Sequence, residues 1–260
     1  MKRSLMLLAL FFLMTNSYAN NAPQESRDFY VIRFYHCTSK NQIAQLDAYL
    51  KDIYLPFLHK NGISKVGVFE PVDNDTASDK KLMVWIPFNN LNEIDQLDNI
   101  YEKIDPFGND PLIRIQAEDS SSLYTRYETI ITKAFKFQTQ YSKESDLVKS
   151  PDRIFEYRSY ESRTDQLHLN KVHMFNEGQE ITLFKKLNFN AVFYSKAIAG
   201  SRMPNLIYMT SFNNMDDRTA HWKSFTEDPT WKYLSTLPQY QKNVSRNETI
   251  LMHVKDYSDF

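Results

Sequence analysis

The 260-residue sequence has few glycines, no excess of either charge, and no apolar run long enough to cross a membrane. Only five glycines are present, and neither GxGxxG nor GxxxxGK[ST] occurs, which argues against nucleotide-dependent chemistry. Lysine and arginine total 31 against 32 aspartate and glutamate, without a basic cluster, so the charge pattern of a nucleic-acid-binding protein is missing. Because 42 % of the residues are apolar, the composition predicts a globular protein with a packed core.

Cysteine is nearly absent as well, since Cys37 is the only one in the chain. A single cysteine excludes an internal disulfide, so the stability of the fold must come from its core. We expect Cys37 to be a small buried residue at the end of a strand. A catalytic thiol, or an exposed thiol that links two copies, is the alternative.

The N-terminus has the pattern of a secretory signal peptide. Two basic residues precede an apolar stretch at 5–14, and a small-x-small site follows that ends at Ala19. The apolar stretch is too short for a membrane span, which takes about 20 residues. We therefore predict that residues 1–19 are removed and that the mature protein is exported to a periplasmic or extracellular location, without an integral membrane segment.

Short segments of the first half of the chain recur in the second half, in the same order. Residues 29–36 (FYVIRFYH) align with residues 154–161 (IFEYRSYE) at a spacing of 125, and the FNN motif that begins at Phe88 recurs at Phe212, a spacing of 124. An Asp-Pro pair and a Glu-Thr-Ile motif recur at spacings of 123 and 120. Four matches in one order indicate two homologous halves.

We therefore expect a first unit at 28–136, a polar linker at 137–151 and a second unit at 152–258. Each unit has the pattern strand, helix, strand, strand, helix, strand. The expected strands are 29–36, 66–72, 82–88 and 124–134, then 154–161, 191–199, 206–212 and 247–255. The expected helices are 41–60 and 91–103, then 165–187 and 215–225, and the last Asn of each FNN is placed to start the second helix of its unit.

The βαββαβ order is that of a ferredoxin-like unit, which leaves one face of its sheet without helices. Two such units in tandem can set their open faces together, which makes a closed barrel with helices outside and protects the sheet edges. The sequence therefore predicts an α+β fold of two tandem ferredoxin-like units within one chain.

The second half also carries motifs that resemble the NIPSNAP family. They are KVHMFNE at 171–177, AGSRMPNLIYM at 199–209, HW at 221–222 and DPTW at 228–231. The AGSRMPNLIYM run is the most specific, and the first half has the polar loop from Pro71 to Lys81 in its place. The resemblance covers nearly all of residues 152–258 and implies a dimeric α/β barrel fold built from ferredoxin-like units. It implies no settled enzymatic activity, although other families with this fold include cofactor-free monooxygenases and haem-handling enzymes.

Alternation along the strand expected at the start of the second unit places Glu156, Arg158 and Tyr160 on one face, opposite an aromatic face. Because an aromatic face suits packing against helices, we expect the charged face to point into the barrel, and Arg33 and Tyr35 to point inward by the same rule. Two inward arginines would suit an anionic or carboxylate ligand, which a guanidinium binds with two hydrogen bonds. The alternative is a structural ion pair between Glu156 and Arg158.

Three further residues are candidates for a binding site. His173 and Glu177 are four residues apart on an expected helix and therefore share one face. They suit an acid/base pair or two metal ligands, but no HExxH, CxxC or clustered third ligand accompanies them, so we expect no metal; a helix-surface hydrogen bond is the alternative. Arg202 lies in a loop between two strands, where it either lines a site or holds the loop by bonds to carbonyl groups.

Two hypotheses on function follow. The first is an exported, non-enzymatic NIPSNAP-like protein without a cofactor that binds a small anionic ligand or a protein partner. The second is a cofactor-free monooxygenase or a haem-linked oxidoreductase of the dimeric α/β barrel type. A barrel interior that is open and holds the charged strand residues would favour a ligand site, whereas an interior closed by apolar packing would favour a role in surface interactions.

Overall fold

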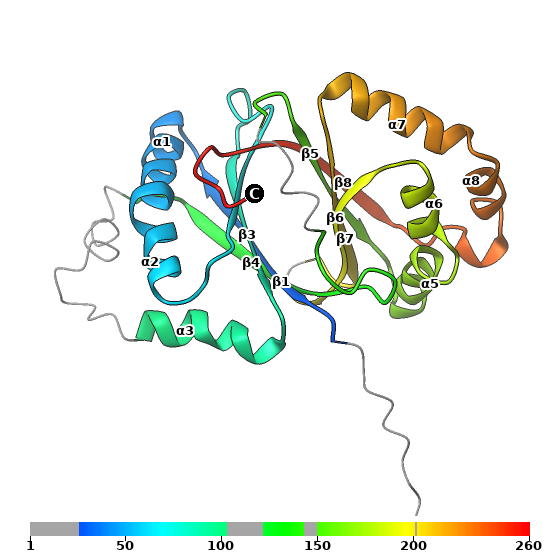
Figure 1. Ribbon diagram of the computed structural model, residues 1–260, viewed down its shortest axis with the longest axis horizontal. Helices are drawn as coiled ribbons and strands as arrows, with labels where there is room; N and C mark the ends of the chain where they lie inside the picture. The colour runs from blue at the N-terminus through cyan, green and yellow to red at the C-terminus, as the bar shows by residue number, and fades with distance from the viewer. Residues whose placement is uncertain (1–25, 103–121, 143–149, 201) are drawn as a thin grey trace, which may run out of the picture.

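The computed structural model describes residues 26–102, 122–142, 150–200 and 202–260. A closed barrel of eight antiparallel strands lies at its centre, and the helices pack against its outer surface on two sides (Figure 1). The predicted signal peptide lies outside the described residues, as do residues 143–149 of the expected linker. In the described part of the chain, no helix has the length and apolar character needed to span a membrane.

The strands and helices of the two halves follow one another in a similar order. The first half contains β1 (Phe29–Cys37), α1 (Lys40–Tyr49), the π-helical turn η1 (Leu50–Tyr54), α2 (Leu55–Lys60), β2 (Gly67–Pro71), β3 (Lys80–Phe88), the 3-10 turn η2 (Leu91–Ile94), α3 (Asp95–Glu102) and β4 (Arg126–Ala134). The second half contains β5 (Ile154–Glu161), α5 (Asp165–Phe175), α6 (Glu180–Lys186), β6 (Asn190–Ala199), β7 (Asn205–Phe212), α7 (Met215–Glu227), α8 (Pro229–Leu234), the 3-10 turn η5 (Pro238–Tyr240) and β8 (Arg246–Val254).

The strands lie within two residues of their expected bounds, but the long first helix of each half is interrupted. Between α1 and α2, Leu55 N–H donates to Leu50 O in a wide π turn, and Pro56, which has no N–H, follows at once. α5 ends at Phe175 with Asn176 as its C-cap, and Gln179, in a left-handed conformation with φ of 68°, is the N-cap of α6. The short helix α8 was not expected, although Asp228 and Pro229 form a regular helix start, in which Asp228 caps Thr230 N–H at 2.7 Å.

The FNN motifs start helices as expected. Asn90 Oδ1 accepts a hydrogen bond from Glu93 N–H, and Asn214 Oδ1 accepts one from Asp217 N–H. Each side chain satisfies a backbone donor that the first helical turn leaves without a partner. The same cap therefore positions η2 and α3 in one half and α7 in the other.

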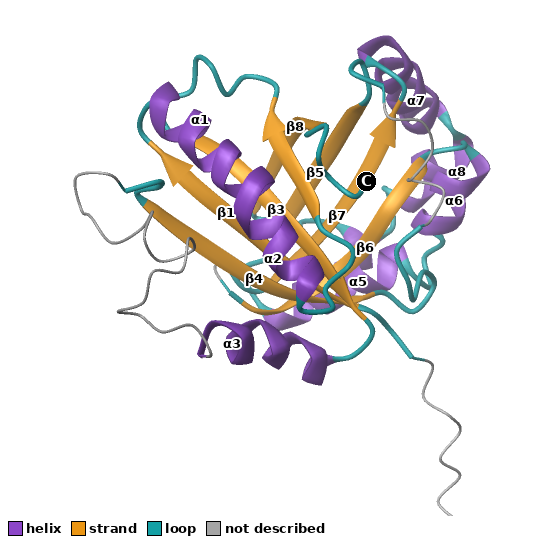
Figure 2. Ribbon diagram, turned by 60° about the vertical axis from the view of Figure 1, so that its left-hand side comes forward, coloured by secondary structure: helices purple, strands orange, loops and turns teal. Residues whose placement is uncertain are grey.

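The strand order around the barrel is β1-β3-β2-β8-β5-β7-β6-β4, and β4 closes the circle on β1. Each half thus contributes four neighbouring strands, in the order fourth, first, third, second of that half. The halves meet at two seams, where β2 pairs with β8 and β4 pairs with β6. In Figure 2 the helices lie outside the strands, with α1, α2 and α3 on one half and α5 to α8 on the other.

The barrel interior is filled by apolar and aromatic side chains from both halves. Trp85 of β3 stacks on Phe193 of β6, with ring centroids 5.4 Å apart, and Phe34 of β1 meets Tyr157 of β5 edge to face at 5.3 Å. Two further apolar clusters lie between the barrel and the helices, one in each half. The interior is therefore a packed core shared by both halves.

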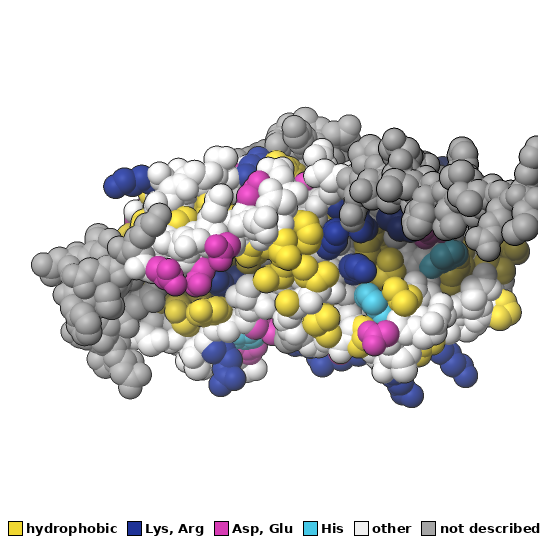
Figure 3. Space-filling view, turned by 90° about the horizontal axis from the view of Figure 1, so that it is seen from below, with side chains coloured by type: hydrophobic (Ala, Val, Ile, Leu, Met, Phe, Trp, Pro, Cys, Tyr) yellow, Lys and Arg dark blue, Asp and Glu magenta, His cyan; other side chains and the backbone are white. Residues whose placement is uncertain are grey.

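On the outer surface, the face seen from below in Figure 3 carries acidic, basic and apolar side chains side by side. Neither charge sign dominates its described part. This mixture agrees with the balanced composition.

Candidate functional site

The charged faces of β1 and β5 point outward, towards the helices, so the expectation that they line the barrel interior is wrong. Phe155 and Tyr157 of β5 belong to the interior core, while Glu156 and Tyr160 between and beyond them face the helices of the second half. On β1 the interior residues are Tyr30, Ile32 and Phe34, and Arg33 and Tyr35 between and beyond them face outward. Glu156 finds the charged partner Arg218 and the donor Trp222 on helix α7, whereas the interior cluster consists of apolar and aromatic side chains.

In the second half, the fully buried carboxylate of Glu156 is surrounded by nitrogen donors. Arg158 Nε donates at 2.7 Å, Arg218 Nε and Nη2 donate at 2.8 and 3.0 Å, and Trp222 Nε1 donates at 2.7 Å. The guanidinium of Arg158 also lies 4.0 Å from the centre of the Trp222 ring and donates to Tyr160 OH at 3.0 Å. These side chains fill the space between β5 and α7. Glu156 and Arg158 thus form the structural ion pair that was the alternative to a ligand site.

In the first half, the corresponding space is a cavity of about 440 Å³. Its polar lining consists mainly of Arg33, Tyr35, Tyr49, Tyr124, Tyr127 and Thr129. Arg33 Nε donates to Thr129 Oγ1 at 3.1 Å, Arg33 Nη1 donates to Tyr35 OH at 3.4 Å, and its guanidinium lies 4.6 Å from the centre of the Tyr127 ring. The structure thus brings two of the predicted site residues, Arg33 and Tyr35, to one cavity.

The internal repeat explains why this space is open in one half. The two halves differ in size and charge at three equivalent positions. Val31 of the first half corresponds to Glu156 of the second, Ile94 to Arg218, and Asp98 to Trp222. The first pair is 125 residues apart and the other two pairs are 124 apart, the spacings of the strand and FNN matches. Smaller side chains over β1 leave the volume that an arginine and a tryptophan fill over β5.

Two tyrosines of the cavity, Tyr35 and Tyr124, have a raised pKa. Burial raises the pKa of Tyr35, and burial followed by the neighbouring Tyr127 raises the pKa of Tyr124. Both phenols are therefore neutral at physiological pH and can donate hydrogen bonds to a ligand. Together with Arg33, they make the cavity suited to an anionic group next to aromatic surface.

His173 and Glu177 have separate partners. His173 Nδ1 is hydrogen-bonded to the Tyr240 hydroxyl at 2.7 Å, and Glu177 Oε1 accepts from Lys136 Nζ at 3.1 Å. Among the described residues, no group of three or more His, Cys, Asp or Glu side chains is placed to hold a metal ion. His173 therefore connects α5 to the 3-10 turn η5, and Glu177 connects the turn after α5 to the segment that follows β4.

Arg202 is held by carboxylates instead of by carbonyl groups. Its Nη1 is paired with Glu248 of β8, and its Nε lies 4.0 Å from Glu161 of β5. The residue adopts a left-handed conformation with φ of 61°. The β6–β7 loop is thereby fastened to the neighbouring strands. Cys37, in turn, is buried at the end of β1 as expected, and burial raises the pKa of its thiol to about 11.

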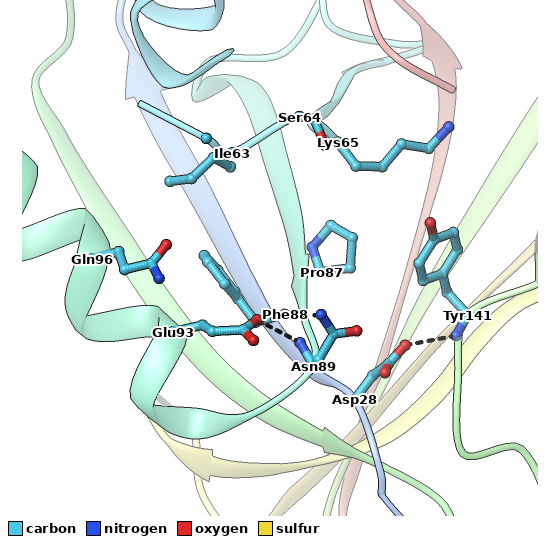
Figure 4. A pocket seen from close by; sticks show the side chains of 11 residues that line it. Asp28, Ile63, Ser64, Lys65, Pro87, Phe88, Asn89, Glu93, Gln96 and Tyr141 are labelled. Atoms are coloured by element: carbon cyan, nitrogen blue, oxygen red, sulfur yellow. Dashed lines mark hydrogen bonds between the residues drawn. The ribbon is translucent and has the colours of Figure 1, made fainter. Parts of the chain in front are cut away.

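Two cavities at strand ends were missed at the level of the sequence, although they occupy equivalent places in the two halves. The first, of about 410 Å³, is shown in Figure 4 and includes Asp28, Lys65 and Glu93. Asp28 is 3 % exposed and accepts from Tyr141 N–H at 3.2 Å; burial raises its pKa. The second, of about 790 Å³, includes Arg153, which follows Asp28 at the strand spacing of 125. The spacing of the repeat was the sequence signal that could have indicated that the two cavities are equivalent.

These features define an antiparallel α/β barrel protein with ligand-sized cavities on the outside of the barrel. Within it, residues 155–259 match the family model of NIPSNAP, which confirms the resemblance seen in the motifs of the second half. A comparison with curated proteins gave no match.

Solved structures share the fold at low sequence identity. An anthrone oxidase-like protein is 11 % identical with a TM-score of 0.57, over 89 % of this chain and 92 % of that one. A candidate monooxygenase from Lactobacillus acidophilus NCFM is 9 % identical with a TM-score of 0.52, over 88 % and 94 % of the two chains. A NIPSNAP family protein from Agrobacterium tumefaciens is 21 % identical with a TM-score of 0.36, over 41 % of this chain and 96 % of its own. The first two similarities show the fold and nothing about the reaction.

Proposed function

We propose that the protein binds a small, partly aromatic anion in the cavity of the first half, and that it does so without catalysing a reaction. The observation that carries the proposal is the 440 Å³ volume over β1, where the second half has a filled network. This volume lies in the range of small-molecule sites, and a lining of aromatic groups with one cation is typical of such sites.

The ligand class follows from the lining. The guanidinium of Arg33 suits a carboxylate, the neutral hydroxyls of Tyr35 and Tyr124 suit further acceptor atoms, and the ring of Tyr127 offers a face for an aromatic group. Because Asp98 also lines the cavity, a ligand with several negative charges is disfavoured. A monocarboxylate with one or two rings meets these conditions.

Binding of 1-naphthoate, compared with neutral 1-naphthalenemethanol, tests the proposal by calorimetry. We expect saturable binding of the carboxylate, a loss of about tenfold in affinity or more in Arg33→Met, and loss of binding in Asp98→Trp, which places the tryptophan of the second half over β1. Arg246→Met, at an arginine with 60 % of its side chain exposed, serves as the matched control and should bind as the wild type does. Equal binding by wild type and Asp98→Trp would show that the cavity is not the site.

The alternative is a cofactor-free monooxygenase, and the phenolic lining together with the fold of the anthrone oxidase-like neighbour supports testing it. Oxygen uptake during aerobic incubation with anthrone separates the two functions, since a binding protein consumes none. For the haem-linked version the lining fits poorly: no histidine is among the described residues of this cavity, which leaves a tyrosine as the axial ligand.

We also propose that the two halves are tandem ferredoxin-like units and that the protein is exported after removal of residues 1–19. The equal strand order of the halves and the spacing of their matches support the first proposal, and the signal-peptide pattern supports the second. The mass of the mature protein from its host tests export, because cleavage after Ala19 predicts an N-terminus at Asn20.

A further inference from the structure

The strand-end cavity of the second half has a polar and basic lining. It lies where the end of β7, the start of α7 and the loop between α6 and β6 come together, and its volume is about 790 Å³. The charged and titratable groups on its wall are Arg153, Lys185, Asp217 and His221. This cavity is separate from the one over β1, so a ligand bound here is independent of the ligand proposed for the first half.

Arg153 is the unusual member of this lining, because it is a buried cation that has no counter-charge among the residues that the structure describes. The residue is 9 % exposed, and none of the ion pairs among the described residues includes it. Its Nη1 donates to Ser211 Oγ and its Nη2 to Asn213 Oδ1, both at 3.3 Å, and its buried Nε has no acceptor. Long bonds to neutral oxygens compensate a buried guanidinium poorly. An anion in the cavity would supply the missing charge.

The one carboxylate of the lining is already engaged by other groups. Asp217 Oδ2 accepts from Asn213 N–H at 2.9 Å, and Asp217 Oδ1 lies 3.1 Å from His221 Nδ1. Lys185 is exposed and adds a second positive charge at the rim. The charge of the cavity wall is therefore positive even with His221 neutral.

We propose that this cavity binds a small hydrophilic carboxylate of the sugar-acid or hydroxy-acid class. Its carboxylate pairs with Arg153, and its hydroxyl groups bind the side-chain amides of Asn188 and Asn213. The equivalent cavity of the first half, shown in Figure 4, has the opposite character, since Asp28 stands in place of Arg153 and Glu93 in place of Asp217 with no histidine beside it. The repeat has thus produced one acidic and one basic cavity.

Titration of the full chain with sodium D-glucuronate, against neutral D-glucose at matched ionic strength, tests the proposal by calorimetry and saturation-transfer NMR. We expect saturable binding of glucuronate, much weaker binding of glucose, and a loss of about tenfold or more in glucuronate affinity in Arg153→Met. Arg33→Met, which changes the other cavity, should leave glucuronate binding unchanged. Absence of saturable binding in the wild type, or equal affinities for glucuronate and glucose, would overturn the proposal.

Thermal unfolding without ligand separates a binding arginine from a structural one. If Arg153 is kept for a ligand, Arg153→Met removes an uncompensated charge and should melt at or above the wild-type temperature while binding is lost. If that variant does not fold, Lys185→Gln takes its place, because Lys185 is exposed and its substitution should weaken glucuronate binding severalfold without changing the melting temperature. Unchanged affinity in Lys185→Gln, or retained affinity in a folded Arg153→Met, contradicts the assignment.

Discussion

Substitution of Glu156 by glutamine should destabilise the protein more than a change of one charge on its surface. The wild-type carboxylate receives four hydrogen bonds of 2.7 to 3.0 Å from Arg158, Arg218 and Trp222. In addition, Arg158 Nη2 lies 2.7 Å from Glu156 Oε1. Glutamine keeps the shape but replaces one acceptor oxygen with an amide nitrogen and leaves two neighbouring arginines without a counter-charge. The two guanidinium groups then repel each other in the buried space between β5 and α7.

The size of the effect follows from burial. Removing one partner of a buried ion pair costs about 3–5 kcal/mol. Since the side chains of Arg158 and Arg218 keep 17 % and 21 % of their exposure to solvent, the lower end, about 3 kcal/mol, applies. For a protein of this length that loss lowers the melting temperature by roughly 6–12 °C.

Urea unfolding followed by tryptophan fluorescence measures the change in the free energy of unfolding. Glu177→Gln is the matched control, because Glu177 pairs with exposed Lys136 and should lose about 1 kcal/mol or less. In the double variant Glu156→Gln with Arg218→Gln, removal of one repelling arginine should recover part of the loss, so that the two effects are not additive. A Glu156→Gln variant within about 1 kcal/mol of the wild type would refute the reasoning that the network is a buried charge cluster.

Other substitutions test the pKa shifts and the helix start. Burial raises the pKa of Asp28 above its unfolded value, so its ionisation costs stability as the pH rises through the folded pKa; Asp28→Asn should therefore gain on the wild type between acidic and neutral pH in thermal scans. The hydrogen bond from Lys186, and then that from Thr230 N–H, lower the pKa of Asp228, so its contribution to stability is present at neutral pH and is lost as the pH falls below about 4. In thermal scans, the loss of stability in Asp228→Asn relative to the wild type should therefore shrink below that pH. A loss that does not depend on pH would contradict the shift. Asn214→Ala should lower the free energy of unfolding in urea by about 1 kcal/mol, because the side-chain acceptor for Asp217 N–H is lost. Asn214→Asp keeps an acceptor and should leave that free energy unchanged.

The strands could be predicted from the sequence because they are short segments with a simple period and turn residues at their ends. The FNN helix starts could also be predicted, since a cap is a local interaction between residues three apart. The break between α5 and α6 and the π turn before Pro56 could not, because apolar spacing continues through both. Backbone conformation at single residues such as Gln179 leaves no mark on that spacing.

The candidate site was predicted in part. Strand alternation correctly separated Glu156, Arg158 and Tyr160 from Phe155 and Tyr157, but it does not state which face meets the barrel interior. That choice depends on partners far along the chain, such as Arg218, which the pattern of one strand does not contain. The repeat carried more information than the alternation did, because comparison of Val31 with Glu156 at one spacing indicates which half keeps an open volume.

The closed strand order restricts how a protein partner can attach. Each described strand has a neighbour on both sides, and unpaired strand edges are confined to the two seams, where β2 pairs with β8 and β4 with β6 over only a few residues. Most of the surface open to a protein partner therefore consists of side chains on the helices and the connecting loops. Variants that alter recognition are to be sought there, among residues whose substitution leaves the strand ladder intact.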